Sequence, residues 1–66
     1  MSDKSEWPEV VGFPGEQAKT IILNDDPTVN AQVIPEGSPV TMDYRTDRVR
    51  ILVDGSGIVV SVPIRG

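Results

Sequence analysis

One short stretch of the chain, residues 37–50, holds the residue types that could take part in chemistry. Met42 lies in a segment where prolines restrict the backbone and β-branched residues favour an extended conformation. Arg48 and Arg50 follow two positions apart, so on a strand both side chains project to the same face. Guanidinium groups donate strong, directional hydrogen bonds to carboxylates. The pattern predicts a peptide presented for recognition, with cations behind it that could hold it in place.

Catalysis by this chain is not indicated. It has no histidine and no cysteine, the residues that most readily activate or act as nucleophiles. Asp43 and Asp47 are not expected to be catalytic acids, because a chain of 66 residues has no room for a cleft that raises a carboxyl pKa. Disulfides are excluded, and a zinc site would need carboxylate ligands alone. We therefore expect no enzyme activity, no cofactor and no metal.

Charge is unevenly distributed along the chain. The net charge is −4; residues 1–44 hold two lysines against eight acids, net −6, and residues 45–66 hold four arginines against two acids, net +2. An acidic protein is not expected to bind a nucleic acid, because the phosphates are also negatively charged. The sequence has no run of about 18 apolar residues, so a membrane span is not predicted. The N-terminus lacks the apolar core of a signal peptide. Cytoplasmic, vacuolar and extracellular locations all stay open.

A single helix is predicted over residues 14–24. An apolar stripe recurs there at helical spacing, formed by Ala18, Ile21 and Ile22. Gly15 favours a frayed first turn, because glycine is a weak helix former.

Two acids follow this helix. Asp25 and Asp26 precede Pro27, and the residue before a proline avoids the helical region. We interpret both acids as ending the helix, with no further role. Arg65, near the other end of the chain, is interpreted as a surface residue.

Three strands are predicted at residues 29–34, 48–53 and 58–62 from apolar alternation and continuous apolar runs. The last two are expected to be antiparallel across the turn at residues 54–57. One helix packed on three strands gives a two-layer α+β domain.

The domain is expected to span residues 7–66, after a disordered polar segment at residues 1–6. Trp7 is the only tryptophan and is expected in the core, because an aromatic ring of this size contributes much buried area. The interval at residues 35–47 is long for a connection in so small a domain, and such loops are commonly functional or disordered. Its two prolines favour a constrained loop.

Several motifs, in their order and spacing, match one known family. They are WPEVVG at residues 7–12, QA at 17–18, PEGSPVTMD at 35–43, DRVR at 47–50, VP at 62–63 and the final Gly66. On these motifs the chain resembles the potato inhibitor type I family of serine-protease inhibitors.

The resemblance implies a single helix packed on a small mixed β-sheet, with an extended, exposed reactive-site loop between two parallel strands. It also implies a reversible, substrate-like inhibitor with the reactive bond Met42–Asp43. The residues expected to contact the protease are Ser38, Pro39, Val40, Thr41, Met42, Asp43, Tyr44 and Arg45.

The family pattern directs Arg48 and Arg50 at the loop, where the side chains of Thr41 and Asp43 accept hydrogen bonds. The C-terminal carboxylate, here on Gly66, can help to position the arginines. Which arginine binds which acceptor is left open, and Arg45 is either a further brace or a surface charge.

Met42 as the anchor implies partners with a roomy apolar primary pocket. These are subtilisin-like and chymotrypsin-like serine proteases, with elastase-like enzymes as a further class; neither nucleic acid nor a membrane is expected, and the inhibitor is expected to be a monomer. The alternative is a non-inhibitory binding module that presents the same loop. A small nucleic-acid binder using Arg45, Arg48 and Arg50 is a weaker alternative.

Overall fold

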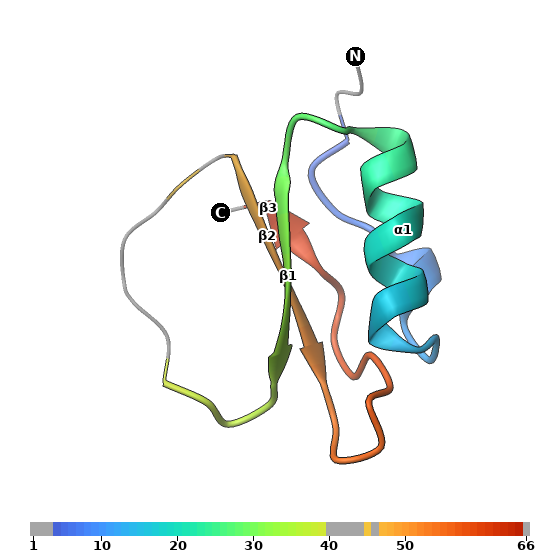
Figure 1. Ribbon diagram of the computed structural model, residues 1–66, viewed down its shortest axis with the longest axis vertical. Coiled ribbons are helices and arrows are strands. Elements are labelled where there is room, and N and C mark those ends of the chain that lie inside the picture. Colours follow the sequence, from blue (N-terminus) through green and yellow to red (C-terminus); the bar gives the residue numbers. More distant parts are fainter. Residues whose placement is uncertain (1–3, 40–44, 46, 66) are drawn as a thin grey trace.

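The computed structural model describes residues 4–39, 45 and 47–65. Within them the chain forms a short 3₁₀ helix, η1 (Pro8–Val10), one α-helix, α1 (Gly15–Asp25), and three strands, β1 (Asn30–Pro35), β2 (Arg48–Val53) and β3 (Ile64–Arg65). The helix packs on one side of the sheet (Figure 1). The predicted α+β class, with one helix on a small mixed sheet, is confirmed.

The parallel pair β1–β2 determines the course of the loop. Its register runs from Asn30 opposite Arg48 to Pro35 opposite Val53. Because the strands are parallel, the chain must return from the end of β1 to the start of β2, along the whole length of the pair. The five steps between the six residues of each strand, at about 3.3 Å each, make that return on the order of 17 Å.

The third strand lies later in the chain than predicted. β3 pairs antiparallel with β2, with Arg65 opposite Val49. The predicted strand at residues 58–62 is replaced by an isolated antiparallel bridge between Val53 and Val59. Val59 also pairs with the N-terminal segment: its N–H donates to the Phe13 carbonyl at 2.9 Å, and its carbonyl accepts from the Gly12 N–H at 2.9 Å. After Val60, whose N–H donates to the Leu52 carbonyl at 3.0 Å, the chain bonds to the N-terminal segment instead, where the Pro63 carbonyl accepts from the Trp7 N–H at 3.0 Å.

The first turn of α1 packs against the sheet and is hydrogen-bonded, although the sequence predicted that it would be frayed. Gly15 is buried, and a Cβ atom at this position would lie 2.8 Å from the Cγ1 atoms of both Val33 and Val53. Its N–H donates to the Gly57 carbonyl at 2.8 Å. The glycine therefore permits a close approach of helix and sheet. The helix begins and ends one residue later than predicted.

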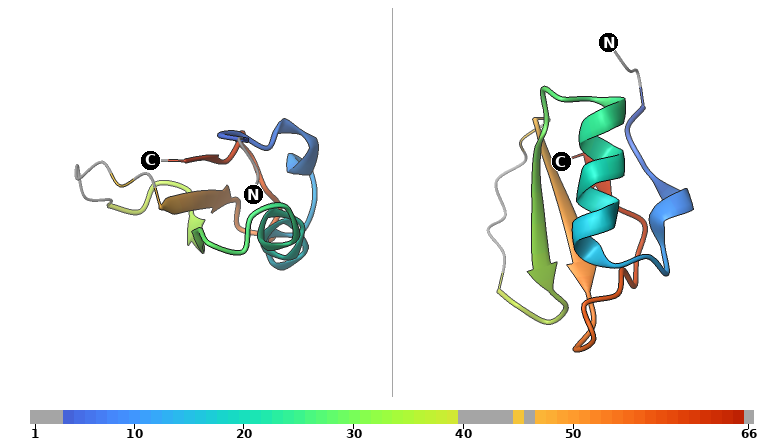
Figure 2. Two further views of the ribbon diagram at one scale, coloured as in Figure 1. Left: turned by 90° about the horizontal axis from the view of Figure 1, so that it is seen from above. Right: turned by 45° about the vertical axis from the view of Figure 1, so that its right-hand side comes forward.

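Helix α1 lies along one side of the sheet (Figure 2), and the core side chains lie between them. Trp7 has no exposed surface, as predicted, and Ile22, Val49 and Ile51 are equally buried. Among the described residues, the core cluster of buried apolar side chains consists of Trp7, Val10, Ala18, Ile22, Val29, Ala31, Val49, Ile51, Val53 and Val59.

The two ends of the described chain lie side by side. Glu6 forms an antiparallel bridge with Ile64, and the Arg65 N–H donates to the Ser5 carbonyl at 2.8 Å. Disorder was expected at residues 1–6; residues 4–6 make these contacts, and residues 1–3 lie outside the described part. Within residues 4–39, 45 and 47–65, no helix is long and apolar enough to cross a membrane.

Candidate functional site

The segment that follows β1 leaves the strand through a fixed turn. The Ser38 N–H donates to the Pro35 carbonyl at 3.2 Å, and Gly37 has a φ of +81°. A turn of this kind needs a positive φ at its third residue, which glycine adopts without strain. The Glu36 N–H also donates to the Val53 carbonyl at 2.7 Å. The chain therefore leaves the sheet in a defined direction.

The segment that precedes β2 is attached at the opposite end of the sheet. The Asp47 carbonyl accepts from the Asn30 N–H at 2.6 Å, and the Arg45 carbonyl accepts from the Arg48 N–H at 3.2 Å. The side chains of Arg45 and Asp47 are exposed, with Nε 4.0 Å from Oδ1. Both flanks of residues 40–44 are thus held by backbone hydrogen bonds, one at each end of the β1–β2 pair.

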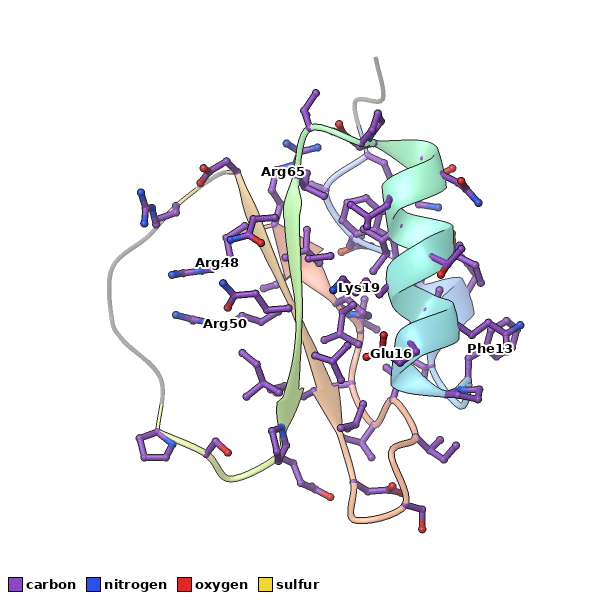
Figure 3. All side chains as sticks on the ribbon, viewed as in Figure 1. Phe13, Glu16, Lys19, Arg48, Arg50 and Arg65 are labelled. Atoms are coloured by element: carbon purple, nitrogen blue, oxygen red, sulfur yellow. The ribbon has the colours of Figure 1, made fainter. Side chains whose placement is uncertain are left out.

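Arg48 and Arg50 project from β2 on the side of the sheet away from α1 (Figure 3). The predicted common face of the two arginines is confirmed. Arg48 is only 7% exposed, and Arg50 is half-buried. A guanidinium group this deep in a protein normally has hydrogen-bond partners, because an uncompensated buried charge is costly. The flanks of the loop leave the sheet on this same side (Figure 2).

The structure brings together part of the predicted site. Ser38, Pro39 and Arg45 lie in the two flanks, and Arg48 and Arg50 lie behind them on β2. The remaining predicted site residues lie outside the described part of the chain, so their roles stay predictions. They are Val40, Thr41, Met42, Asp43, Tyr44 and Gly66.

The interpretation of Asp26 and Arg65 was wrong. Asp26 is 2% exposed and accepts hydrogen bonds from the Thr28 hydroxyl at 2.5 Å and the Thr28 N–H at 3.1 Å. Its other carboxylate oxygen is paired with the Arg65 guanidinium. The hydrogen bond from the Thr28 hydroxyl, followed by those from Arg65 and from the Thr28 N–H, lowers the pKa of Asp26 to about 2. Arg65 is accordingly half-buried, not a surface residue.

Asp25 also has partners. Its carboxylate accepts from the Trp7 indole N–H at 3.0 Å and from the Lys4 ammonium at 3.3 Å. Lys4 also pairs with Glu9; this hydrogen bond is the main cause that raises the pKa of Lys4 and lowers the pKa of Glu9.

The sequence did contain a signal for these contacts. Two acids at the C-terminal end of a helix oppose the helix dipole, so the pair Asp25 and Asp26 needs cations from elsewhere in the chain. Lys4 and Arg65 supply that charge from the two chain ends.

The fold and the fixed flanks of residues 40–44 can be compared with those of known proteins. The chain matches the potato inhibitor I family over residues 1–66. It is 52% identical over 60 residues to an inhibitor of trypsin and Hageman factor from Cucurbita maxima, covering 91% of this chain and 88% of the relative. It is 49% identical over 63 residues to a chymotrypsin inhibitor from Lumbricus terrestris, covering 96% of this chain and 73% of the relative.

Solved structures agree with this match. The crystal structure of bitter gourd trypsin inhibitor superimposes with a TM-score of 0.92 at 46% identity, covering 96% of this chain and 93% of that one. The chain belongs to the potato inhibitor I family, which confirms the resemblance found in its motifs. On the basis of this family and these relatives, it is a protease inhibitor and not an enzyme.

Proposed function

We propose that the chain is a reversible, substrate-like inhibitor of serine endopeptidases that have an apolar primary pocket, with Met42–Asp43 as the reactive bond. One observation supports this most directly: the flanks of residues 40–44 are attached to opposite ends of a parallel strand pair, with Arg48 and Arg50 projecting on the same side of the sheet. Such a frame suits an extended peptide offered to a protease, which binds its substrates as strands.

Fixed flanks explain how such a segment could bind tightly. A loop whose ends are already held loses less conformational freedom on docking, so more of its contact energy appears as affinity. The turn at Gly37 and the hydrogen bond from Asn30 to Asp47 provide this restriction without a disulfide.

The same frame suits slow hydrolysis. In the proposed reaction the protease's serine oxygen attacks the Met42 carbonyl carbon, and its proton passes to the protease's histidine and then to the Asp43 nitrogen as the C–N bond breaks. The products are an acyl ester and a free amine. If hydrogen bonds from Arg48 and Arg50 to Thr41 and Asp43 hold the amine beside the ester, the amine nitrogen attacks the ester carbon and the C–N bond re-forms. The C–O bond to the serine then breaks, and the proton from the amine returns through the histidine to the serine oxygen.

Met42 determines the proposed specificity. An unbranched, polarisable side chain fills apolar pockets of varied shape, so subtilisin-like and chymotrypsin-like enzymes are the proposed targets, with elastase-like enzymes as a further class. The pocket of trypsin holds an aspartate, which Met42 cannot neutralise. The Cucurbita maxima relative is named for trypsin, whereas this chain has methionine at the proposed anchor.

The first experiment is a titration of subtilisin, chymotrypsin, elastase and trypsin with the intact chain. A one-to-one endpoint is expected with subtilisin and chymotrypsin, and weak inhibition with trypsin. Met42→Lys should shift inhibition towards trypsin, and unchanged specificity would show that Met42 is not the anchor. Binding of subtilisin without inhibition would favour a non-inhibitory module that presents the same loop.

The second experiment tests the bracing. Arg50→Ala should leave the chain folded and accelerate cleavage at Met42–Asp43 during incubation with subtilisin, followed by mass spectrometry. Lys19→Ala is the matched control, because Lys19 is a cation on α1, away from the loop (Figure 3). Equal cleavage rates for the two variants would remove the bracing from the proposal.

A further inference from the structure

We propose that the Asp26–Arg65 ion pair is a positioning device for the loop, which keeps Arg48 and Arg50 aligned by holding both neighbours of the first half of β2 in place. The inference rests on the proposed function, since it assigns a consequence to the alignment of these two arginines. It assigns a role to two residues that lie outside the loop and outside β2.

The first step is the location of Arg65. It lies on β3 directly opposite Val49, which is the residue between Arg48 and Arg50. β3 is only two residues long, so few backbone hydrogen bonds attach it to β2. Arg65 also carries contacts to the N-terminal segment: its N–H donates to the Ser5 carbonyl at 2.8 Å, and its guanidinium donates to the Lys4 carbonyl at 3.4 Å.

The second step is the location of Asp26. It follows α1 directly, and its carbonyl accepts from the Val29 N–H at 3.4 Å, in the turn that leads into β1. The next residue, Asn30, is opposite Arg48 and donates its N–H to the Asp47 carbonyl at 2.6 Å. Asp26 therefore lies in the turn that leads into β1, and its carboxylate is bonded to Thr28 within that turn.

The ion pair joins these two edges. Arg65 reaches from β3 to the C-terminal end of α1, at the end of the sheet where β2 begins (Figure 3). The exposed fractions of the two side chains are 24% for Arg65 and 2% for Asp26. Removing one partner of a pair this buried leaves the other uncompensated, which is strongly unfavourable. The carboxylate therefore holds β3 in place, while Thr28 fixes its orientation through two hydrogen bonds.

The charge of Arg48 and Arg50 and the direction in which their side chains project depend on different parts of the structure. Their guanidinium groups are proposed to reach the loop, while the direction in which they reach depends on the backbone of β2. That backbone has β1 on one side and β3 on the other. Loss of the pair frees β3 and the entry to β1 together, so the arginines keep their charge and lose their alignment.

The experiment compares hydrolysis of the intact chain by subtilisin at Met42–Asp43 for Arg65→Ala, Asp26→Asn and wild type. Each single variant should be cleaved at least about fivefold faster than wild type, the lower end of typical coupling between sites. Arg65→Lys keeps a cation for Asp26 and should restore most of the resistance. A lysine variant that is cleaved as fast as the alanine variant would overturn the role of the ion pair.

A stability-matched control separates positioning from general loosening. Ala18→Gly weakens α1 at a buried site that is in neither β2 nor β3, and urea is added until its unfolded fraction equals that of Arg65→Ala. If the two variants are then cleaved equally fast, the proposal is overturned. A second readout is hydrogen exchange of the Arg48 and Arg50 side-chain Nε–H groups, which should accelerate in Arg65→Ala and stay unchanged in Ala18→Gly.

The outcomes distinguish this inference from the proposed function. If wild type is not an inhibitor, or is cleaved first at a different bond, the proposed function fails and this inference fails with it. If Arg50→Ala is cleaved faster while Arg65→Ala matches Ala18→Gly, only the positioning role of the ion pair is removed. Should Arg65→Ala not fold, Asp26→Asn gives the same test with a side chain of nearly equal size.

Discussion

The two faces of β2 present different kinds of side chain, one apolar and one carrying two arginines. Towards α1 it presents Val49 and Ile51, which have no exposed surface, and Val53, which is 6% exposed. Away from α1 it presents Arg48 and Arg50. Because successive side chains alternate in direction, neighbours in sequence belong to different environments.

Exposure alone does not separate these faces. Arg48 is 7% exposed, nearly the same as Val53. The difference is what the burial accomplishes: an apolar side chain gains free energy by leaving water, whereas a guanidinium must replace its hydration with hydrogen bonds. The helix-facing side should therefore control cohesion, and the arginine side should control the geometry of the loop.

The largest effect is expected from Ile51→Ala. This residue is fully buried on the helix-facing side, and truncation of such a side chain typically costs about 2–5 kcal/mol of unfolding free energy. Urea denaturation measures the loss. Arg50→Ala, one residue earlier and on the opposite face, should cost clearly less; equal losses for the two variants would break the comparison.

A smaller effect is expected from Gly15→Ala. The new methyl group would meet Val33 and Val53 at 2.8 Å, and crowding of this kind costs about 1–3 kcal/mol. That opposes the roughly 1 kcal/mol which alanine gains over glycine in a helix. Gly55→Ala is the matched control, because a methyl group there would have nothing within 4 Å and the φ of Gly55 is not positive. Thermal unfolding of both variants should show a lower midpoint for Gly15→Ala alone.

The Asp26–Arg65 ion pair is a polar interaction at the end of α1, and its contribution to the stability of the fold depends on pH. The folded pKa of Asp26 is about 2, below its ordinary value of 3.8. Its contribution to stability is therefore complete above the ordinary value and is lost as the pH falls through about 2. Asp26→Asn should be less stable than wild type at pH 7 and should lose less stability between pH 5 and pH 2, by urea denaturation across that range. Parallel curves for the two proteins would contradict the pairing.

The smallest effect is expected from Arg45→Ala, on the loop side. Arg45 and Asp47 are 63% and 68% exposed, with 4.0 Å between Nε and Oδ1. Exposed pairs of this kind contribute between about 0 and 1 kcal/mol, so the unfolding midpoint in urea should change little. A loss approaching that of Ile51→Ala would show that the loop side also controls cohesion.

Local patterns predicted the central part of the fold. The strand at residues 48–53 was predicted with its correct bounds, and β1 lies one residue later than predicted. The bounds of both strands were predicted from apolar alternation, which works because each strand has one face on the core. The parallel pairing of these strands and the role of the loop between them were predicted from the family motifs. Apolar periodicity alone does not reveal how two strands pair.

The errors share a physical cause, which is contact between segments distant in sequence. The predicted third strand is reduced to the Val59 bridge with β2, and the chain then bonds to the N-terminal segment through the Pro63 carbonyl. Gly15 is unfavourable by helix propensity and necessary for close packing on the sheet. Asp26 and Arg65 are 39 residues apart, and no local pattern connects them. The reactive bond at Met42–Asp43 stays a prediction that the proteolysis experiments will test.

The contact between the chain ends has a consequence for protein engineering. Ser5 and Arg65 share a backbone hydrogen bond of 2.8 Å, so a linker placed between these two residues would span a very short gap. A circular backbone would restrict the unfolded chain far more than the folded one, and so favour folding. New termini could then be opened at the exposed turn around Gly55 and Ser56, where a break is tolerated best. A chain permuted in this way would carry its proposed protease-binding loop close to the new C-terminus, while the fused original ends would lie in its N-terminal part.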